Sequence, residues 1–369
     1  MSEYYIGLMS GTSMDGVDAL LVDLANPPYQ ILAWHYETMP ATLKTALLSL
    51  CDSAQISFKQ LGTLDVKLGR LFAKAALQVL SKTNLTPQDI IAIGSHGQTV
   101  CHYPNNDPLF TLQIADPNTI AAQTNITTVA DFRRRDMALG GQGAPFVPVF
   151  HQNVFQHSQE DKAIINIGGL ANITLLFADS NKPTIGYDTG PGNTLLDGWI
   201  GKHLQKPYDE SGTWAASGSV DHDLFTALRN DPYFHKPHPK STSREYFNLA
   251  WLDHHLQQCT QNIAIENVQA TLLELTASTI AQAIQQGLAA GSTIILHGGG
   301  SQNQYLCARL KQLLSDYPLC DSEAFGIDPQ CVEAMAFAWL AQQTMARKAI
   351  DLRQITGARA PSILGGVYY

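Results

Sequence analysis

The first apolar segment of the chain is interrupted by a polar, glycine-containing turn and then resumes. Residues 4–9 are short and apolar, 10–16 mix Gly with Ser, Thr and Asp, and 17–24 alternate as a strand does. The same pattern returns at 163–177, where apolar residues surround the turn 168–172. Each pattern predicts a β-hairpin with a long polar loop, and the pair predicts a duplicated domain plan.

Segments with helical periodicity alternate with these and with further strands. Apolar residues recur at the 3.6-residue period of amphipathic helices in 61–80, 268–289 and 329–345. Asp328 and Pro329 suit the N-cap and the first turn of the last helix. Additional strands are expected at 90–94, 109–114, 127–130, 184–187 and 293–297. Such alternation is typical of α/β proteins with mixed or parallel sheets.

Two irregular stretches indicate how the chain is organised. The glycine-rich run 140–143 breaks any regular element, which favours a boundary near 138–160. The stretch 205–240 is rich in Gly, Ser, Asp, Pro and His and predicts an irregular insertion with short helices. A chain of 369 residues has the length of two domains or of one large α/β unit.

Composition excludes several classes of protein. Hydrophobic residues make up 45% of the chain and charged residues 15%, which predicts a substantial core and excludes disorder as the main state. Asp and Glu outnumber Lys and Arg by 32 to 23, so the surface lacks the basic face that binds nucleic acids or membranes. Any anion must then be bound by local groups. Without a signal-peptide pattern or a long apolar run, a soluble cytoplasmic protein is expected.

Four glycine-rich turns each follow an expected strand, at 10–16, 168–172, 188–193 and 298–300. Glycine allows backbone N–H groups to converge on a ligand, and the hydroxyls of Thr12 and Ser13 add donors that suit phosphate oxygens. Any single turn is better explained as a tight turn of a large α/β protein, but four at strand ends favour ligand binding. The fingerprints of a Walker A loop and of a dinucleotide-binding fold are missing. The remaining interpretation is that phosphate is held between two hairpin loops, as in actin, hexokinase and the heat-shock ATPases.

A set of motifs makes the resemblance more specific. The chain resembles the anhydro-N-acetylmuramic acid kinases at 7–18 (GLMSGTSMDGVD), 94–99 (GSHGQT), 130–136 (ADFRRRD), 140–145 (GGQGAP), 166–169 (NIGG), 188–193 (DTGPGN), 214–218 (WAASG) and 333–340 (EAMAFAWL). These motifs cover essentially the whole chain. The resemblance implies an α/β fold of two duplicated actin-like (ribonuclease H-like) lobes with a cleft between them. The first lobe would comprise residues 1–140, and the C-terminal helix can cross back to it. The second lobe would comprise residues 141–369 and contain the insertion near 205–240.

The resemblance also implies a reaction. The family uses ATP and water to open the 1,6-anhydro ring of anhydro-N-acetylmuramic acid during cell-wall recycling, giving N-acetylmuramic acid 6-phosphate and ADP. ATP and Mg²⁺ are the implied cofactors, and a homodimer is compatible with the sequence. Two alternatives stay open: a kinase of another anhydro sugar such as levoglucosan, and a non-enzymatic, nucleotide-dependent regulator of the actin type.

Site residues follow from the same resemblance. Asp188 is the implied general base, although an Asx-turn residue would have the same sequence context. The nucleotide would contact three loops through Gly11, Thr12, Ser13, Met14, Asp15, Gly16, Val17 and Asp18, through Gly168 and Gly169, and through Gly298, Gly299 and Gly300. The sugar would contact His96, Thr99, Arg135 and Glu333. Arg135 is chosen from three consecutive arginines to bind the lactyl carboxylate, and a solvated charge cluster is the alternative. The remaining histidines, including His235, His238, His254 and His255, are expected at the surface.

One position departs from the wider superfamily. Related sugar kinases carry an Asp near the magnesium at the end of the first strand, and Met9 occupies that place here. Because Mg²⁺ needs only one or two protein carboxylates, Asp15 and Asp18 are the candidate substitutes.

Overall fold

The computed structural model describes residues 2–11, 13–53, 55–259 and 261–369. The chain divides into two compact units: unit 1 comprises Met1–Phe150 and Cys331–Tyr369, and unit 2 comprises His151–Gln330. Residues 331–369 belong to unit 1, in agreement with the expectation that the C-terminal helix can cross back to the first lobe, although the second lobe was expected to span 141–369. The reason is that helix α12 (Val332–Met345) packs against the sheet of that unit.

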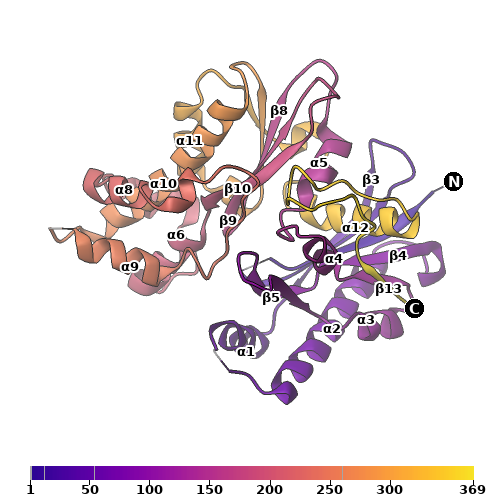
Figure 1. Ribbon diagram of the computed structural model, residues 1–369. Coiled ribbons are helices and arrows are strands. Elements are labelled where there is room, and N and C mark those ends of the chain that lie inside the picture. Colours follow the sequence, from indigo (N-terminus) through magenta and orange to yellow (C-terminus); the bar gives the residue numbers. More distant parts are fainter. Residues whose placement is uncertain (1, 12, 54, 260) are drawn as a thin grey trace. The chain divides into compact units, whose positions relative to one another are not determined.

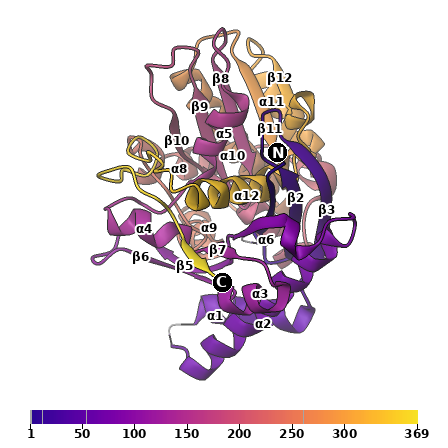
Figure 2. The ribbon, with the colours of Figure 1, turned by 90° about the vertical axis from the view of Figure 1, so that its right-hand side faces the viewer.

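Unit 1 is built on a six-stranded sheet in the order β13-β7-β4-β1-β2-β3 (Figure 1). Its strands are β1 (Tyr4–Met9), β2 (Gly16–Asp23), β3 (Gln30–Thr38), β4 (Ile90–Ser95), β7 (Thr128–Ala130) and β13 (Gly366–Tyr368). Strands β1, β2 and β3 form an antiparallel meander, while β4 and β7 continue the sheet parallel to β1. The C-terminal strand β13 pairs antiparallel with β7 (Figure 2). A separate two-stranded sheet consists of β5 (Gln98–Tyr103) and β6 (Phe110–Ile114).

Helices cover both faces of this sheet (Figure 1). The main core of unit 1 lies on one face, between β1, β2 and the helices α1 (Ala41–Asp52), α2 (Phe58–Leu80) and α3 (Pro117–Thr124). Helix α2 presents an apolar stripe to this core, which is why its periodicity was visible in the sequence. The short helix α4 (Phe132–Ala138) follows β7 and carries the three arginines.

Helix α12 covers the opposite face of the unit 1 sheet and lies very close to it. A Cβ at Gly7 in β1 would lie 1.8 Å from the carbonyl oxygen of Ala334, and one at Gly94 in β4 would lie 2.0 Å from that of Phe337. Only glycine leaves room for such an approach between a helix backbone and a strand. Two glycines 87 positions apart (94 − 7) thus fix where the C-terminal helix docks.

Unit 2 repeats the same strand plan. Its sheet has the order β10-β9-β8-β11-β12, made of β8 (Lys162–Ile167), β9 (Leu170–Leu176), β10 (Ile185–Pro191), β11 (Thr293–His297) and β12 (Leu319–Asp321). Here too three antiparallel strands come first, and two strands then continue the sheet parallel to the first of them. Because the order and directions match those of β3-β2-β1-β4-β7, the duplication predicted from two hairpins is confirmed, and each unit has the actin-like (ribonuclease H-like) plan.

The core of unit 2 lies between this sheet and helix α10 (Ile265–Gly287). The other helices are α6 (Thr194–Leu204), α7 (Thr213–Ser217), α8 (His222–Arg229), α9 (Leu249–Gln258) and α11 (Gln304–Leu313), with 3₁₀ turns that include η2 (Glu210–Gly212) and η3 (Pro232–His235). The expected irregular insertion thus contains two short helices and two 3₁₀ turns. Helix α5 (Val147–Phe155) contains the boundary between the units. No helix among the described residues is long and apolar enough to cross a membrane.

The expected start of the last helix is wrong by three residues. Helix α12 begins at Val332 with Cys331 as its N-cap residue, and not at Pro329. Asp328 does cap a turn, but a separate one: its Oδ1 accepts the backbone N–H of Gln330 at 2.8 Å. A capping pattern predicts a local turn, and whether a helix continues from that turn depends on packing beyond it.

Candidate functional site

The first glycine loop of unit 1 is tied to the start of β5 by a side-chain network. The Ser10 hydroxyl lies 2.8 Å from the carbonyl oxygen of Gly16 and 2.7 Å from Oε1 of Gln98. Nε2 of Gln98 in turn donates to the carbonyl oxygen of Gly11 at 3.2 Å. Gln98 belongs to the motif 94–99, so two motifs that are far apart in sequence form one structure. These hydrogen bonds, all within unit 1, fix the shape of the loop.

Glycines in the loops fall into two groups. A Cβ at Gly11 or at Gly299 would meet nothing within 4 Å. A Cβ at Gly298 would lie 2.2 Å from Oδ1 of Asn166, and one at Gly300 would lie 2.2 Å from Cγ2 of Ile167. Packing therefore explains glycine at 298 and 300, whereas at 11 and 299 it does not. Open space next to backbone N–H groups is what a bound ligand would need.

The remaining residues of the first loop differ in their exposure. The side chains of Met14 and Val17 are part of the unit 1 core, so only their backbone atoms could face a ligand. Ser13 is exposed, and Asp15, also exposed, pairs with Lys44. Thr12, expected at the nucleotide, lies outside the described residues.

Asp18 lies directly opposite Met9 in the β1–β2 ladder. Residues opposite each other in antiparallel strands point to the same face, with Cβ atoms about 4.5–5.5 Å apart. The carboxylate missing at position 9 is therefore present on the neighbouring strand. Oδ1 of Asp18 accepts the indole N–H of Trp34 at 3.2 Å.

His96 and Arg133 meet in unit 1. Nε2 of the buried His96 accepts hydrogen bonds from Nε and Nη2 of Arg133, at 3.1 and 2.9 Å, and Nη1 of Arg133 donates to the carbonyl oxygen of Gly143 at 2.7 Å. Burial and the adjacent guanidinium hold the pKa of His96 well below its usual value, so the ring is neutral and can accept. Arg134 pairs with Asp131, while Arg135, the arginine expected at the substrate, is exposed at the end of α4.

Glu333 lies near the same place, on the first turn of α12. It is one helical turn before Phe337, whose ring centroid is 4.7 Å from that of His96. Residues four apart share a helix face, so Glu333 projects from the side of α12 that faces His96. Thr99 lies in β5, where its Oγ1 accepts a hydrogen bond from Gln113 at 3.1 Å. Of the expected sugar contacts, His96 and Glu333 thus lie on the same side of α12, and Arg135 is exposed.

Asp188 is almost entirely buried, at 6% exposure, and belongs to unit 2. It was expected after the end of a strand at 184–187, but β10 continues to Pro191 and Asp188 lies within it, next to a bulge. Oδ2 of its carboxylate accepts the backbone N–H of Thr242 at 2.9 Å. Its main chain is held as well, since its N–H donates to the carbonyl oxygen of Lys240 at 3.1 Å and its carbonyl accepts the hydroxyl of Tyr233 at 2.7 Å.

A row of polar residues crosses the unit 2 sheet at the level of Asp188. The ladders pair His297 with Asn166, Asn166 with Asn172, and Asn172 with Asp188. All four side chains therefore project from one face of the sheet, opposite the apolar face that packs on α10. Asn172, opposite Asp188 in the neighbouring strand, was not among the predicted site residues. An asparagine within an apolar strand was the available signal.

The other supporting residues, Tyr233, Lys240 and Thr242, had no local signal in the sequence. They lie 45, 52 and 54 positions after Asp188 (233 − 188, 240 − 188 and 242 − 188), in the irregular insertion and just beyond it. Their relation to Asp188 depends on the path of that segment back to the edge strand β10.

The family model and the curated relatives match the chain over essentially its full length. The family model described as anhydro-N-acetylmuramic acid kinase matches residues 3–369. The chain is 50% identical over 367 residues to an anhydro-N-acetylmuramic acid kinase of Coxiella burnetii, covering 100% of this chain and 98% of that one. It is 50% identical over 363 residues to one of Shewanella sp. (strain MR-7), covering 98% of both. A solved activator of 2-hydroxyisocaproyl-CoA dehydratase from Clostridium difficile is 13% identical with a TM-score of 0.45, covering 94% of this chain and 99% of that one.

Proposed function

The chain belongs to the anhydro-N-acetylmuramic acid kinase family, and from that premise we propose which of its residues carry out the reaction. It is an enzyme of cell-wall recycling that phosphorylates anhydro-N-acetylmuramic acid with ATP. The observation that carries the proposal is the buried carboxylate of Asp188, oriented by a backbone N–H and anchored through its own main chain.

Asp188 acts as the general base in this proposal. Water attacks C1 of the sugar and passes a proton to Asp188, the bond from C1 to O6 breaks, and O6 takes the γ-phosphoryl group as ADP leaves. A carboxylate suits this role because it accepts the proton at the moment when water becomes a nucleophile. The hydrogen bond from Thr242 fixes the plane of the carboxylate, and Asn172 lies beside it on the same face, where it can bond a sugar hydroxyl or the water.

The glycine loops bind the nucleotide. The loop at Gly11–Asp18 and the pair Gly168–Gly169 would contact phosphate oxygens through backbone N–H groups, and the turn at Gly298–Gly300 would pack against adenosine. Open space at Gly11 and Gly299 supports this assignment, because glycine at those positions has no packing role in the fold.

For the sugar carboxylate we favour Arg133 over Arg135. The lactyl group needs a guanidinium that is held in place, since a bidentate pair depends on fixed geometry. Arg133 is oriented by His96 and Gly143, whereas Arg135 projects from the end of α4 into solvent. His96, Thr99 and Glu333 would then bind the neutral parts of the sugar from the same unit.

Mg²⁺ fits the residues present through Asp18. Magnesium keeps several waters and needs one or two carboxylates in addition to nucleotide phosphates, whose charge it neutralises. Asp18 supplies one carboxylate on the strand next to Met9, and Asp15 is engaged by Lys44. Cytoplasmic location and a homodimer belong to the same proposal.

The test is whether ADP release depends on the sugar. Purified protein with ATP and Mg²⁺ should release ADP in proportion to added anhydro-N-acetylmuramic acid. Levoglucosan, which lacks the lactyl and N-acetyl groups, should be a far poorer substrate. Equal rates with both sugars would favour a general anhydro-sugar kinase, and ADP release that ignores every sugar would favour a regulator of the actin type.

A further inference from the structure

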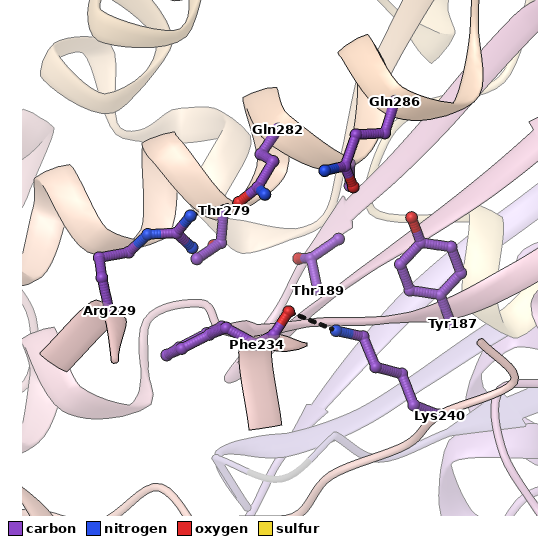
Figure 3. Close-up of a pocket in the computed structure, with 9 residues that line it drawn as sticks. Tyr187, Thr189, Arg229, Phe234, Lys240, Thr279, Gln282 and Gln286 are labelled. Carbon is purple, nitrogen blue, oxygen red and sulfur yellow. Dashed lines mark hydrogen bonds between the residues drawn. The ribbon is translucent and has the colours of Figure 1, made fainter. Parts of the chain in front are cut away.

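A small hollow in unit 2 lies beside β10 (Figure 3). Tyr187 and Thr189, the neighbours of Asp188 in the strand, line this hollow. Because successive side chains of a strand point to opposite sides, the hollow lies on the other side of β10 from the Asp188 side chain. Helix α8 contributes Arg229, and the segment after η3 contributes Lys240. The hollow has a volume of about 30 Å³ and is partly open to solvent. That is below the usual size of a site for a whole cofactor, so it suits one charged group.

The hollow concentrates positive charge. Figure 3 shows Arg229 and Lys240 reaching in from opposite sides, with Thr189 between them. Among the described residues, no carboxylate lies within 4 Å of either cation. Asp188 acts on Lys240 only at longer range, from the other side of β10. The chain as a whole has a net charge of −9, so this hollow, with two half-buried cations that form no ion pair among the described residues, differs in charge from the rest of the protein.

Both cations are held in place by neutral groups. Arg229 donates to Oε1 of Gln282 and lies with its Cζ 5.4 Å from the ring centroid of Phe234. Nζ of Lys240 donates to the carbonyl oxygens of Tyr233 and Phe234, at 3.2 and 3.5 Å. These contacts orient the charged ends and do not neutralise them. An anion between the two would gain charge-assisted hydrogen bonds with little loss of side-chain entropy.

The electrostatics of the two residues agree with this geometry. Burial, together with the nearby charges of Arg229 and Lys236 and against the opposite effect of Asp188, lowers the pKa of Lys240 to about 8. Burial also lowers the pKa of Arg229. Holding such cations together costs free energy that a bound anion would offset.

We propose that this hollow binds a phosphate group, either as free phosphate or as part of a small phosphate monoester. A tetrahedral dianion matches two cations that approach from opposite sides, and hydroxyls such as that of Thr189 can bond its remaining oxygens. The site is separate from the glycine loops, and the proposal does not depend on the assignment of the nucleotide site.

Thermal unfolding of the full chain in increasing inorganic phosphate tests the proposal, with ionic strength held constant by chloride. The wild type should show a saturable rise in Tm. Arg229→Gln and Lys240→Met each remove one charge and keep the side chain's approximate size. Each should raise the half-saturating phosphate concentration about tenfold or more. Arg229→Lys keeps the charge and should retain most of the response.

Lys182→Met is the matched control, because it makes the same replacement at an exposed lysine of unit 2 that contacts the ring of Phe177 and lies outside the hollow. It should respond as the wild type does. Glucose 6-phosphate as a second probe separates the two sources: saturation at a lower concentration than inorganic phosphate indicates a monoester, and no gain indicates free phosphate. The proposal is overturned if the wild type shows no saturable response, or if Arg229→Gln and Lys240→Met respond as fully as the wild type.

Discussion

Oδ2 of Asp188 accepts the backbone N–H of Thr242 at 2.9 Å, although the two residues are 54 positions apart. A backbone donor cannot be altered by side-chain substitution, so this bond persists as long as the segment 240–242 keeps its path beside β10. The bond fixes the carboxylate of the proposed base without using a second charged residue, and it determines how that base can be tested.

Asp188→Asn should reduce kcat by about 10²–10⁴ with little change in either KM. The amide oxygen of asparagine can still accept from Thr242, so the fold is kept while basicity is lost. ADP release and formation of the reducing sugar should fall together, because ring opening provides O6 for phosphorylation. A kcat like that of the wild type would show that another group is the base, and Glu333 would be the next candidate.

Tyr233→Phe should lower kcat about three- to tenfold without abolishing activity. The hydroxyl holds the carbonyl of Asp188, and its loss costs roughly 1–2 kcal/mol of stability and loosens the base. Tyr246→Phe is the control, since it removes a comparable hydrogen bond, to Asp231, within the same unit. If both variants lose the same stability in urea unfolding but only Tyr233→Phe loses kcat, Tyr233 positions the base. If both variants lose kcat equally, Tyr233 contributes only to the stability of the unit and does not position the base.

Arg133→Ala should raise the KM for anhydro-N-acetylmuramic acid strongly, by the equivalent of roughly 2–5 kcal/mol, and affect levoglucosan much less. Arg135→Ala should leave both sugars nearly unchanged, because that side chain is exposed. Steady-state kinetics of the two variants with both sugars decide between the arginines. A large effect confined to Arg135→Ala would return the carboxylate to the residue first expected from the sequence.

Gly11→Val should raise the KM for ATP far more than the KM for the sugar. A side chain at this position meets nothing within 4 Å in the protein, so its cost appears only when a ligand approaches the loop. Gly62→Val in α2 has the same open surroundings and is exposed, and it should change neither KM. An unchanged KM for ATP in folded Gly11→Val would remove the loop from the phosphate site.

Stability should depend on pH through the buried His297. The ring lies 5.1 Å from that of His151, burial lowers its pKa to about 3, and neither ring nitrogen has a hydrogen-bond partner among the described residues. The unfolded chain binds a proton at this residue near pH 6.5 and the folded chain does not. The stabilising effect is therefore full above about pH 6.5 and is lost as pH falls toward 3.

His297→Phe should make unfolding less sensitive to acid. At pH 5 the wild type should have lost about 2 kcal/mol at this residue relative to pH 7, which the variant should not lose. Urea unfolding at the two pH values measures the difference. His235→Phe, at an exposed position, should leave the pH dependence as it is in the wild type. If His297→Phe shows the full wild-type dependence, the buried histidine is not its source.

The sequence by itself determined the strands that precede the glycine loops at 10–16, 168–172 and 298–300, and it determined the duplicated plan. Strands β1 and β11 were predicted with their exact bounds, and β8 to within one residue, because apolar alternation and glycine turns act over a few residues. The strand from 173 was expected too late, since β9 begins at Leu170 directly after Gly168–Gly169. The short end strands β12 and β13 carry little pattern, since each has only three residues.

Tertiary structure decided what surrounds each candidate residue. Which of three consecutive arginines meets His96 depends on how α4 is rotated, and that rotation is set by packing across the unit and not by the arginines themselves. The support of Asp188 comes from residues 45–54 positions away (233 − 188 and 242 − 188), and the docking of α12 depends on two glycines in other strands. Contacts of this kind arise between distant segments, whose pairing no local periodicity records, so they became visible only in the folded chain.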